Sequence, residues 1–243
     1  MLQGLFNMDN PFWRFMGLLA DLIILNILFV ICSIPIFTIG ASTTALYTVT
    51  LKLAKKQEGY VASTFFKAFK DNFKQATLIW LIALGCGILL GLDIFVLNAM
   101  NVPGERVISY ILIFIVLLYV MTLSYVFPLQ CKFENPIKQT IKNALLLSIA
   151  HFFPRTILVL ILHAIPVFLL WLDVANNMVF MLAYVFPFMS IIGFGVIAYL
   201  SSKNFNKVFA KYIPEDPLDE FEMIPDNYIE EMMNKESKEE DTP

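Results

Sequence analysis

Five long apolar stretches alternate with shorter polar segments along the 243-residue chain. They cover residues 15–37, 76–97, 107–129, 156–172 and 178–200. A helix that crosses the hydrocarbon core of a bilayer, about 30 Å thick, needs about 17–25 predominantly apolar residues. Each stretch reaches this length, the fourth only at the lower limit. The pattern therefore predicts an all-α, polytopic membrane protein with about five transmembrane helices.

The first apolar stretch continues beyond one crossing, because residues 15–51 contain a single charge, that of Asp21. Pro35 and Gly40 interrupt it, and proline both removes a backbone donor and restricts the residue before it. We expect a helix, a break from Pro35 to Gly40, and a second, interfacial helix over about 41–56. The alternative is two full crossings, which gives six in total and an N-terminus inside the cell.

Two polar segments have the pattern of amphipathic helices. The first, residues 62–75, combines a phenylalanine face with basic and amide positions: Phe65, Phe66, Lys67, Phe69, Lys70, Asn72, Phe73 and Lys74. The second, residues 136–152, is a weaker example. Basic amphipathic helices lie in the membrane interface with their cations near anionic headgroups. We therefore predict two cytoplasmic interfacial helices here.

Lysine and arginine are distributed unevenly between the apolar stretches. Six lie in residues 52–75, four in 130–155 and three in 203–211, whereas the other side has Arg14 and Arg106. Cytoplasmic segments of membrane proteins carry an excess of Lys and Arg. The distribution predicts an N-terminus outside the cell and a cytoplasmic C-terminus.

The composition agrees with a membrane location. Hydrophobic residues make up 58% and charged residues 15% of the chain, against about 45–50% and about 25% in soluble domains. The mean hydropathy is +0.72. These values exclude disordered, collagen-like, disulfide-rich and nucleic-acid-binding proteins, and they make the lipid bilayer the first expected partner.

The net charge of −3 conceals two parts of opposite sign. Residues 201–243 carry twelve acidic residues and five lysines, whereas the preceding part is mildly basic. The end of the chain also contains several prolines, and this composition is typical of disorder. We therefore predict a helical membrane domain over residues 1–212 and an acidic, flexible cytoplasmic tail over 213–243. Folding of the tail on a partner remains open.

Few polar side chains lie well inside the apolar stretches, and they are the candidates for chemistry. Asp21, Asn26 and Asp93 are a candidate intramembrane site, since buried acids are costly and often functional. The alternative is that both acids reach water or headgroups near the interface. Asn26 is expected to form an interhelical hydrogen bond. For His163, a hydrogen-bonded packing role is favoured over a proton relay, because no acid is expected at its depth.

The remaining signals favour packing over catalysis. Gly87 and Gly91 form a GxxxG pattern, which we interpret as close internal packing. Pro187, Gly193 and Gly195 predict a kink in the fifth apolar stretch. Phosphate-binding, hydrolase, zinc-protease and dinucleotide motifs are absent from the sequence. Its two histidines and three cysteines have no metal-ligand spacing. We therefore predict no catalytic residues, no metal and no cofactor.

Several segments together resemble one family of bacterial membrane proteins. They are residues 21–26 (DLIILN), 33–47 (SIPIFTIGASTTALY), 58–60 (EGY) and 72–76 (NFKQA). They resemble the YesL-like family, a domain of unknown function. The likeness is specific over about residues 15–80, becomes looser toward residue 205, and does not include the acidic tail.

The resemblance implies a cellular context and no catalytic chemistry. Members of the family tend to be encoded beside carbohydrate-uptake ABC transporters and polysaccharide-degrading enzymes in Gram-positive bacteria. Within the matching segments, Pro35 and Gly40 are expected to shape the break. Thr38, Thr43 and Thr44 can satisfy the backbone groups that the break leaves unpaired.

The expected function is therefore that of a non-enzymatic protein of the bacterial cell membrane, an accessory or regulatory partner of a carbohydrate ABC transporter. The alternative is a small transporter or channel in which Asp21, Asn26 and Asp93 line a polar path. A membrane enzyme is the least favoured class. Subunits of a sugar transporter are the expected protein partners, nucleic acid is not, and the oligomeric state is open.

Overall fold

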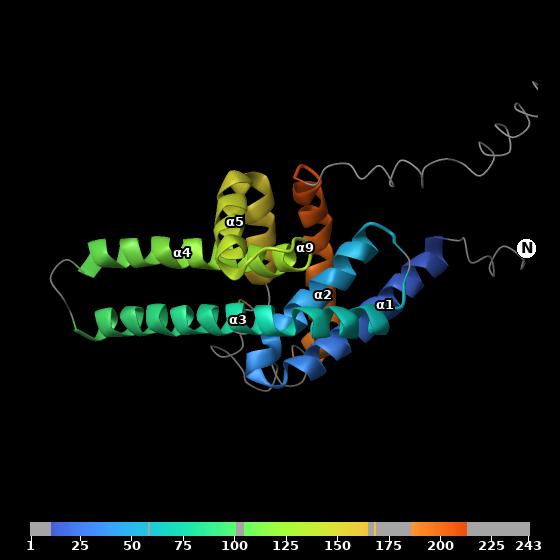
Figure 1. Ribbon diagram of the computed structural model, residues 1–243. Helices are drawn as coiled ribbons and strands as arrows, with labels where there is room; N and C mark the ends of the chain where they lie inside the picture. Colours follow the sequence, from blue (N-terminus) through green and yellow to red (C-terminus); the bar gives the residue numbers. More distant parts are fainter. Residues whose placement is uncertain (1–10, 58, 101–104, 165–167, 169–185, 213–243) are drawn as a thin grey trace, which may run out of the picture. The chain divides into compact units, whose positions relative to one another are not determined.

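The computed structural model describes residues 11–57, 59–100, 105–164, 168 and 186–212. The helices, in chain order, are α1 (Pro11–Ser33), η1 (Ile36–Thr38), α2 (Ile39–Ala54), α3 (Val61–Met100), α4 (Glu105–Gln130), α5 (Ile137–Ala150), η2 (Phe152–Thr156), α8 (Phe186–Phe188), η4 (Met189–Gly193) and α9 (Phe194–Phe209). Residues 157–164 continue as an α-helix after η2. Since this part of the chain contains no strand, the all-α prediction is confirmed (Figure 1).

The chain divides into two compact units, residues 1–206 and 207–243. Each is considered by itself, and all contacts below belong to the first. The predicted tail, residues 213–243, lies outside the described residues.

Within the part of the chain that the structure describes, three helices are long and apolar enough to cross a membrane: Phe12–Ser33, Val61–Leu97 and Arg106–Gln130. A fourth span results if α5 and residues 152–164, which meet at a bend of 109°, act as one broken span. The multi-pass architecture is therefore supported. The predicted crossings over 156–172 and 178–200 fall partly on residues that are not described, so the count of five stays a prediction.

Helix α3 differs from the expected pair of an interfacial helix, 62–75, and a crossing, 76–97. It is one continuous helix of 40 residues, Val61–Met100, about 60 Å long and twice the thickness of the hydrocarbon core. The reason lies in the sequence, because neither glycine nor proline occurs between Val61 and Leu84. The prediction of a separate helix over 62–75 is wrong, and the polar segment instead extends the apolar one.

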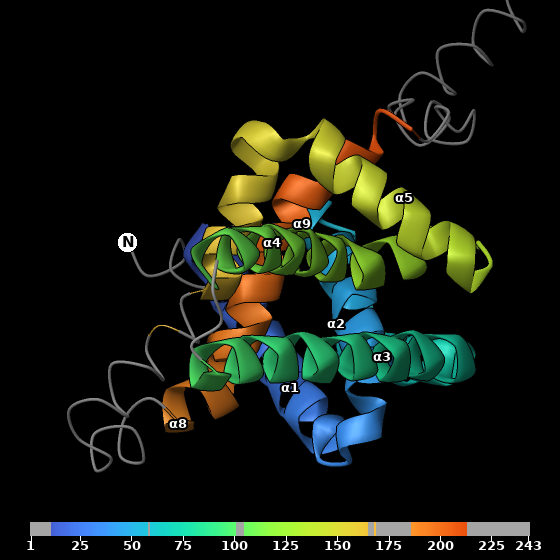
Figure 2. The ribbon, with the colours of Figure 1, turned by 90° about the vertical axis from the view of Figure 1, so that its left-hand side faces the viewer.

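Helix α2 confirms that a helix follows the break, whereas its expected position in the membrane interface stays a prediction. Most of its residues are buried within the protein: Gly40, Ala41, Ser42, Thr44, Ala45, Leu46, Tyr47, Val49, Thr50 and Leu51. It packs against α1, α3 and α4 (Figure 2). Small side chains at its start allow this close packing on several sides. The 41–56 segment is therefore a core helix.

The short connection between α1 and α2 forms a sharp corner. The two helices diverge from it as a V, and their far ends, near Pro11 and Ala54, lie on the same side of the corner (Figure 1). Helix α3 then starts from that side. Helix α2 therefore leads the chain back to the side on which α1 began.

Helix α5 confirms that most of the 136–152 segment is helical. Its buried face is small and polar, with Thr140, Ala144 and Ser148 four residues apart. Large apolar side chains, such as Leu146 and Ile149, are exposed. This arrangement suits a helix whose outer surface contacts lipid, while its interfacial position remains a prediction.

Candidate functional site

The corner between α1 and α2 is fixed by polar side chains from both sides. Thr38 Oγ1 lies 2.6 Å from the carbonyl oxygens of Cys32 and Pro35. From α3, Trp80 Nε1 donates a hydrogen bond of 2.8 Å to the carbonyl oxygen of Ile36. A break in an apolar helix is tolerated where such contacts satisfy the freed backbone groups. The predicted break and the role of Thr38 are confirmed, whereas the contribution of Trp80 was not expected.

Gly40 contributes close packing between α2 and α3. A Cβ atom at this position would lie 2.6 Å from Trp80 Cβ and would overlap the carbonyl oxygen of Ala76. Thr43 and Thr44 donate hydrogen bonds of 2.7 and 3.0 Å to carbonyl groups four residues earlier, within the first turn of α2. These two threonine hydroxyl groups therefore bond within α2 and do not satisfy the groups at the break itself.

Asn26 joins α1 to the helical segment at the other end of the chain. Its side chain is fully buried, and Nδ2 donates hydrogen bonds of 3.0 and 2.7 Å to the carbonyl oxygens of Met189 and Ser190. Its Oδ1 accepts a hydrogen bond of 2.8 Å from the backbone N–H of Gly195. The predicted interhelical role of Asn26 is confirmed.

The acceptors of Asn26 belong to η4, a π-helical turn that directly precedes α9. The stretch in which a kink was predicted therefore contains a π-helix, whose widened turn frees backbone groups. The kink itself stays a prediction. A Cβ atom at Gly195 would lie 2.8 Å from the carbonyl oxygen of Leu22. Glycine at this position thus permits the close approach of α9 to α1 that the Asn26 bonds require.

The other two members of the candidate intramembrane site have different surroundings. Asp21 is half-buried on α1, and Asp93 is exposed on α3. Neither lines the cavity described below. Five positions separate Asp21 from Asn26, which puts them on different faces of α1. A shared site of Asp21, Asn26 and Asp93 stays a prediction.

His163 is hydrogen-bonded at both ring nitrogens. Nδ1 lies 2.8 Å from the carbonyl oxygen of Val159, and Nε2 lies 2.9 Å from the hydroxyl of Tyr47. Since a carbonyl oxygen can only accept a hydrogen bond, Nδ1 carries a proton and donates to Val159. In the neutral ring, Nε2 then accepts a hydrogen bond from the hydroxyl group of Tyr47. The predicted packing role of His163 is consistent with these bonds, whereas the sequence did not reveal Tyr47 as its partner.

A second set of polar contacts connects α2 to α9. The hydroxyl groups of Thr50 and Ser202 are 2.7 Å apart, and Asn206 Nδ2 donates a hydrogen bond of 2.9 Å to the carbonyl oxygen of Leu51. Together with Tyr47, these residues give α2 a polar seam inside an otherwise apolar core. Among the residues that the structure describes, no group of three or more His, Cys, Asp or Glu side chains could hold a metal ion.

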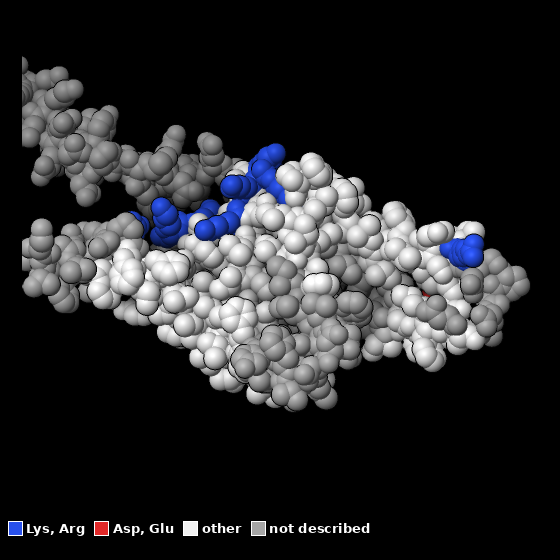
Figure 3. Space-filling model, turned by 180° about the vertical axis from the view of Figure 1, so that it is seen from behind, with Lys and Arg blue, Asp and Glu red and all other residues white. Residues whose placement is uncertain are grey.

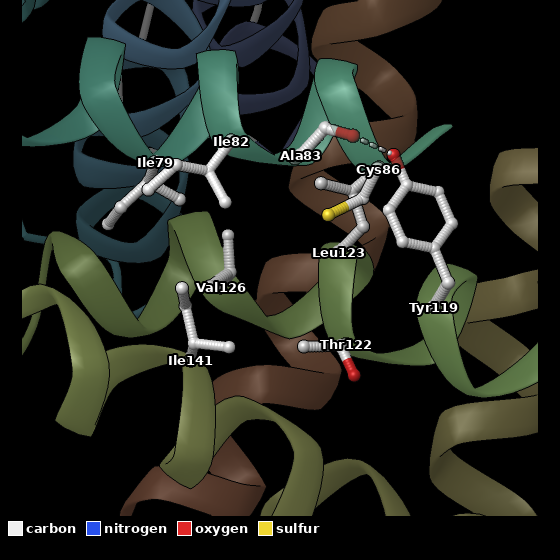
Figure 4. Close-up of a pocket in the computed structure, with 9 residues that line it drawn as sticks. All are labelled: Ile79, Ile82, Ala83, Cys86, Tyr119, Thr122, Leu123, Val126 and Ile141. Atoms are coloured by element: carbon white, nitrogen blue, oxygen red, sulfur yellow. Dashed lines mark hydrogen bonds between the residues drawn. The ribbon is translucent and has the colours of Figure 1, made fainter. Parts of the chain in front are cut away.

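A groove with a cavity volume of about 110 Å³ lies between α3, α4 and α5 (Figure 4). It is lined by Ile79, Ile82, Ala83, Cys86, Tyr119, Thr122, Leu123, Val126 and Ile141. The Tyr119 hydroxyl donates to the carbonyl oxygen of Ala83 at 2.9 Å, and the Thr122 hydroxyl donates to that of Leu118 at 2.8 Å. The groove is therefore apolar in character.

The GxxxG pattern on α3 has one packed and one open member. A Cβ atom at Gly87 would lie 2.9 Å from the Tyr119 hydroxyl oxygen, whereas a Cβ at Gly91 would meet nothing within 4 Å. Close internal packing is thus confirmed at Gly87 and does not extend to Gly91.

The phenylalanine face over 62–75 is divided between protein and surface. Phe65 is fully buried, whereas Phe66 is 50% exposed. The three lysines of this segment, Lys67, Lys70 and Lys74, are exposed. Figure 3, which views the molecule from behind, shows one group of basic side chains toward one end of that face and another at the opposite end, while most of that face is uncharged. This part of α3 is thus held by protein contacts, not by lipid alone.

The comparisons with known proteins agree with the sequence resemblance. A family model described as "Protein of unknown function, DUF624" matches residues 22–94, which include Asn26, the corner and Trp80. The YesL-like resemblance is confirmed. The "Uncharacterized protein YesL" of Bacillus subtilis (strain 168) is 28% identical over 142 residues, 58% of this chain and 66% of the relative. The "Uncharacterized protein YteU" of the same organism is 27% identical over 132 residues, 53% of this chain and 58% of the relative.

The chain therefore covers just under two thirds of the first relative's length and less of the second's. No solved structure matches the chain.

Proposed function

We propose that this chain is a non-enzymatic, multi-pass protein of the bacterial cell membrane that acts as an accessory or regulatory partner of a carbohydrate ABC transporter. The apolar helices α1, α3 and α4 support the membrane location. The YesL-like resemblance supports the transporter context, since that family tends to be encoded with such systems. The structural observation that carries a scaffold role is the use of intramembrane polar groups for the protein's own architecture.

Five side chains make this observation concrete. Asn26, Thr38, Trp80, Tyr119 and His163 each form a hydrogen bond with a backbone carbonyl group. Inside a bilayer such bonds hold helices and corners in fixed positions. A side chain committed to this role contributes little to the recognition of a passing solute. The arrangement favours a rigid platform.

A small transporter or channel remains the competing function. It requires Asp21, Asn26 and Asp93 to face one polar path. The Asn26 amide is already bonded at both its nitrogen and its oxygen, and Asp93 is exposed on α3. These two facts weigh against the path and favour the accessory role.

The orientation in the membrane is part of the proposal. The lysines of residues 52–75 and 130–155 are taken as cytoplasmic, because such residues accumulate on that side. The far ends of α1 and α2 lie on the same side of their corner (Figure 1). This geometry supports the six-crossing alternative, with the N-terminus on the cytoplasmic side, over the predicted external N-terminus.

The surface offered to a transporter subunit is proposed to be the cytoplasmic part of α3. Phe65 and Ala68 are buried within the protein, so this end of the helix is anchored without help from a partner. Lys67, Lys70 and Lys74 remain on its outer side as a basic stripe. An acidic surface of a cytoplasmic or membrane subunit is the partner that such a stripe fits.

Affinity purification from native membranes, followed by identification of bound proteins, tests the proposal. Transporter subunits are expected to be recovered with the full chain. In parallel, the purified protein is reconstituted into lipid vesicles and assayed for solute uptake. Uptake by the protein alone, without recovered partners, would contradict the accessory role and favour the transporter.

A further inference from the structure

We propose that the groove between α3, α4 and α5 binds one acyl chain of an anionic phospholipid, whose headgroup is held by Lys138 and Lys142 of α5. This inference is independent of any transporter partner. It concerns the class of ligand that the groove accepts, and it rests on the lining of the groove, on its position between spanning helices and on the charge of α5.

The lining favours a hydrocarbon chain over a polar ligand. The Tyr119 and Thr122 hydroxyl groups both donate to backbone carbonyl oxygens, so their donors are not available to a ligand. Figure 4 shows the Tyr119 ring lying along the groove with its hydroxyl turned to Ala83. The remaining lining is aliphatic, apart from the thiol of Cys86. A ligand gains burial of apolar surface here and few hydrogen bonds.

The position of the groove determines which apolar ligand reaches it. Its walls on α3 and α4 belong to two candidate membrane spans. Large apolar side chains on the same two helices are exposed, for example Leu78, Ile88, Ile115 and Val120. In a bilayer these surfaces contact lipid tails. An opening in such a surface is filled by the nearest hydrocarbon, which is an acyl chain of a neighbouring lipid.

The third wall of the groove, formed by α5, favours a ligand with a negatively charged headgroup. Ile141 lines the groove, with Lys138 one turn before it and Lys142 directly after it on α5. Both lysines are exposed, and α5 contains no acidic residue. Basic clusters between membrane helices bind anionic headgroups. The pairing of an apolar groove with two lysines at its α5 edge therefore selects phosphatidylglycerol over phosphatidylcholine.

The test is a titration of the detergent-solubilised full chain with phosphatidylglycerol or phosphatidylcholine of equal chain length, with bound lipid counted by native mass spectrometry. The wild type is expected to retain one phosphatidylglycerol and to prefer it to phosphatidylcholine. The double variant Lys138→Glu/Lys142→Glu should weaken phosphatidylglycerol binding by about tenfold or more and abolish the preference. The control variant Lys55→Glu/Lys56→Glu, at two exposed positions in the turn after α2, should leave both unchanged.

The groove itself is tested by filling it. Cys86→Phe adds a ring at an exposed lining position and should reduce the binding of both lipids. Leu89→Phe adds similar volume on the lipid-facing surface of α3, where Leu89 is 63% exposed, and should have no effect. Ala83→Phe provides a second filling variant if Cys86→Phe does not fold. The proposal is overturned if the charge-reversal and filling variants bind phosphatidylglycerol as tightly as wild type, or if the two control variants lose it equally.

Discussion

Asn26 Oδ1 accepts a hydrogen bond of 2.8 Å from the backbone N–H of Gly195, which lies 169 positions later in the sequence. Its amide nitrogen donates to two carbonyl groups of η4, the π-helix that precedes α9. One residue of α1 thus satisfies backbone groups that a widened helical turn leaves without their usual partners. The first apolar helix and the last are connected here by specific bonds in addition to apolar packing.

Replacement of Asn26 by leucine is expected to destabilise the protein more than any substitution on the outer face of α1. Leucine has a similar volume but leaves buried backbone groups unpaired, at a cost of about 1–3 kcal/mol. Thermal unfolding in detergent measures the difference. Ile27→Leu is the matched control, because Ile27 is exposed on the same helix. Equal midpoints for Asn26→Leu and wild type would show that the three bonds contribute nothing.

Substitution of two glycines by alanine should give different effects. Gly40→Ala forces a methyl group against Ala76 and Trp80, and overpacking of this kind costs about 1–3 kcal/mol. Gly17→Ala meets nothing within 4 Å and removes the helix penalty of glycine, which is up to about 1 kcal/mol. Unfolding midpoints should therefore fall for Gly40→Ala and stay constant or rise for Gly17→Ala. A lower midpoint for both variants would argue against a tight contact that is specific to Gly40.

Removal of the Tyr47 hydroxyl isolates its bond with His163. Tyr47→Phe keeps the ring, which contacts Phe205 edge-on with centroids 5.7 Å apart, and leaves His163 Nε2 without this donor. The expected loss of stability is about 1 kcal/mol. Tyr110→Phe, at a position 71% exposed, serves as the control and should be neutral. A double-mutant cycle with His163→Leu should give a coupling energy close to the single loss, whereas zero coupling would contradict the bond.

The sequence revealed the apolar helices and the break, because both follow from local chemistry. Residues 33–40 contain a proline and a glycine. Thr38, between them, donates hydrogen bonds to carbonyl groups only three and six residues earlier. The sequence did not reveal that α2 is buried, since burial of Ala45 or Leu51 depends on which helices surround them. The separate helix over 62–75 was a wrong prediction because no residue ends the helix before the apolar stretch begins. Amphipathic periodicity over 62–75 identifies a helix and two faces, but it does not say whether protein or lipid covers the apolar face.

The sequence predicted that certain polar side chains form hydrogen bonds, but it did not predict the groups to which they bond. A buried asparagine in an apolar helix predicts a hydrogen bond, and this holds for Asn26. Its acceptors lie more than 160 residues away, which no local pattern encodes. The same applies to Trp80, about which the sequence made no prediction and whose ring nitrogen donates to the carbonyl oxygen of Ile36 at the corner.

The orientation is tested with single cysteines in a background that lacks the three native ones. Cysteines introduced at Tyr60 and Gln139 should be protected from an impermeant thiol reagent in intact cells, and one at position 103 should react. A cysteine at position 3 decides between the two orientations of the N-terminus. Protection at position 3 is expected from the V of α1 and α2, whereas labelling there would restore the external N-terminus. Labelling at position 60 would reverse the whole assignment.

The final prediction concerns the basic stripe on the cytoplasmic part of α3. Charge reversal at Lys67, Lys70 and Lys74 should reduce recovery of partner proteins while the unfolding midpoint changes little. The reason is that Phe65 and Ala68 anchor this segment from its buried side, and exposed charges contribute little to stability. Deletion of residues 213–243 is the companion variant, and it should insert and unfold as wild type because it removes none of the five apolar stretches of the sequence.

Substitutions in the connection over residues 98–106 provide the control for the opposite side of the membrane. They are expected to leave partner recovery unchanged, because a subunit that recognises the lysine stripe approaches from the cytoplasm. Recovery of partner proteins from native membranes, normalised to the amount of inserted protein, is measured for the lysine variant, the tail deletion and the substitutions at 98–106. Undiminished recovery with the lysine variant, together with loss from changes at 98–106, would place the docking surface on the other side and refute the stripe as its location.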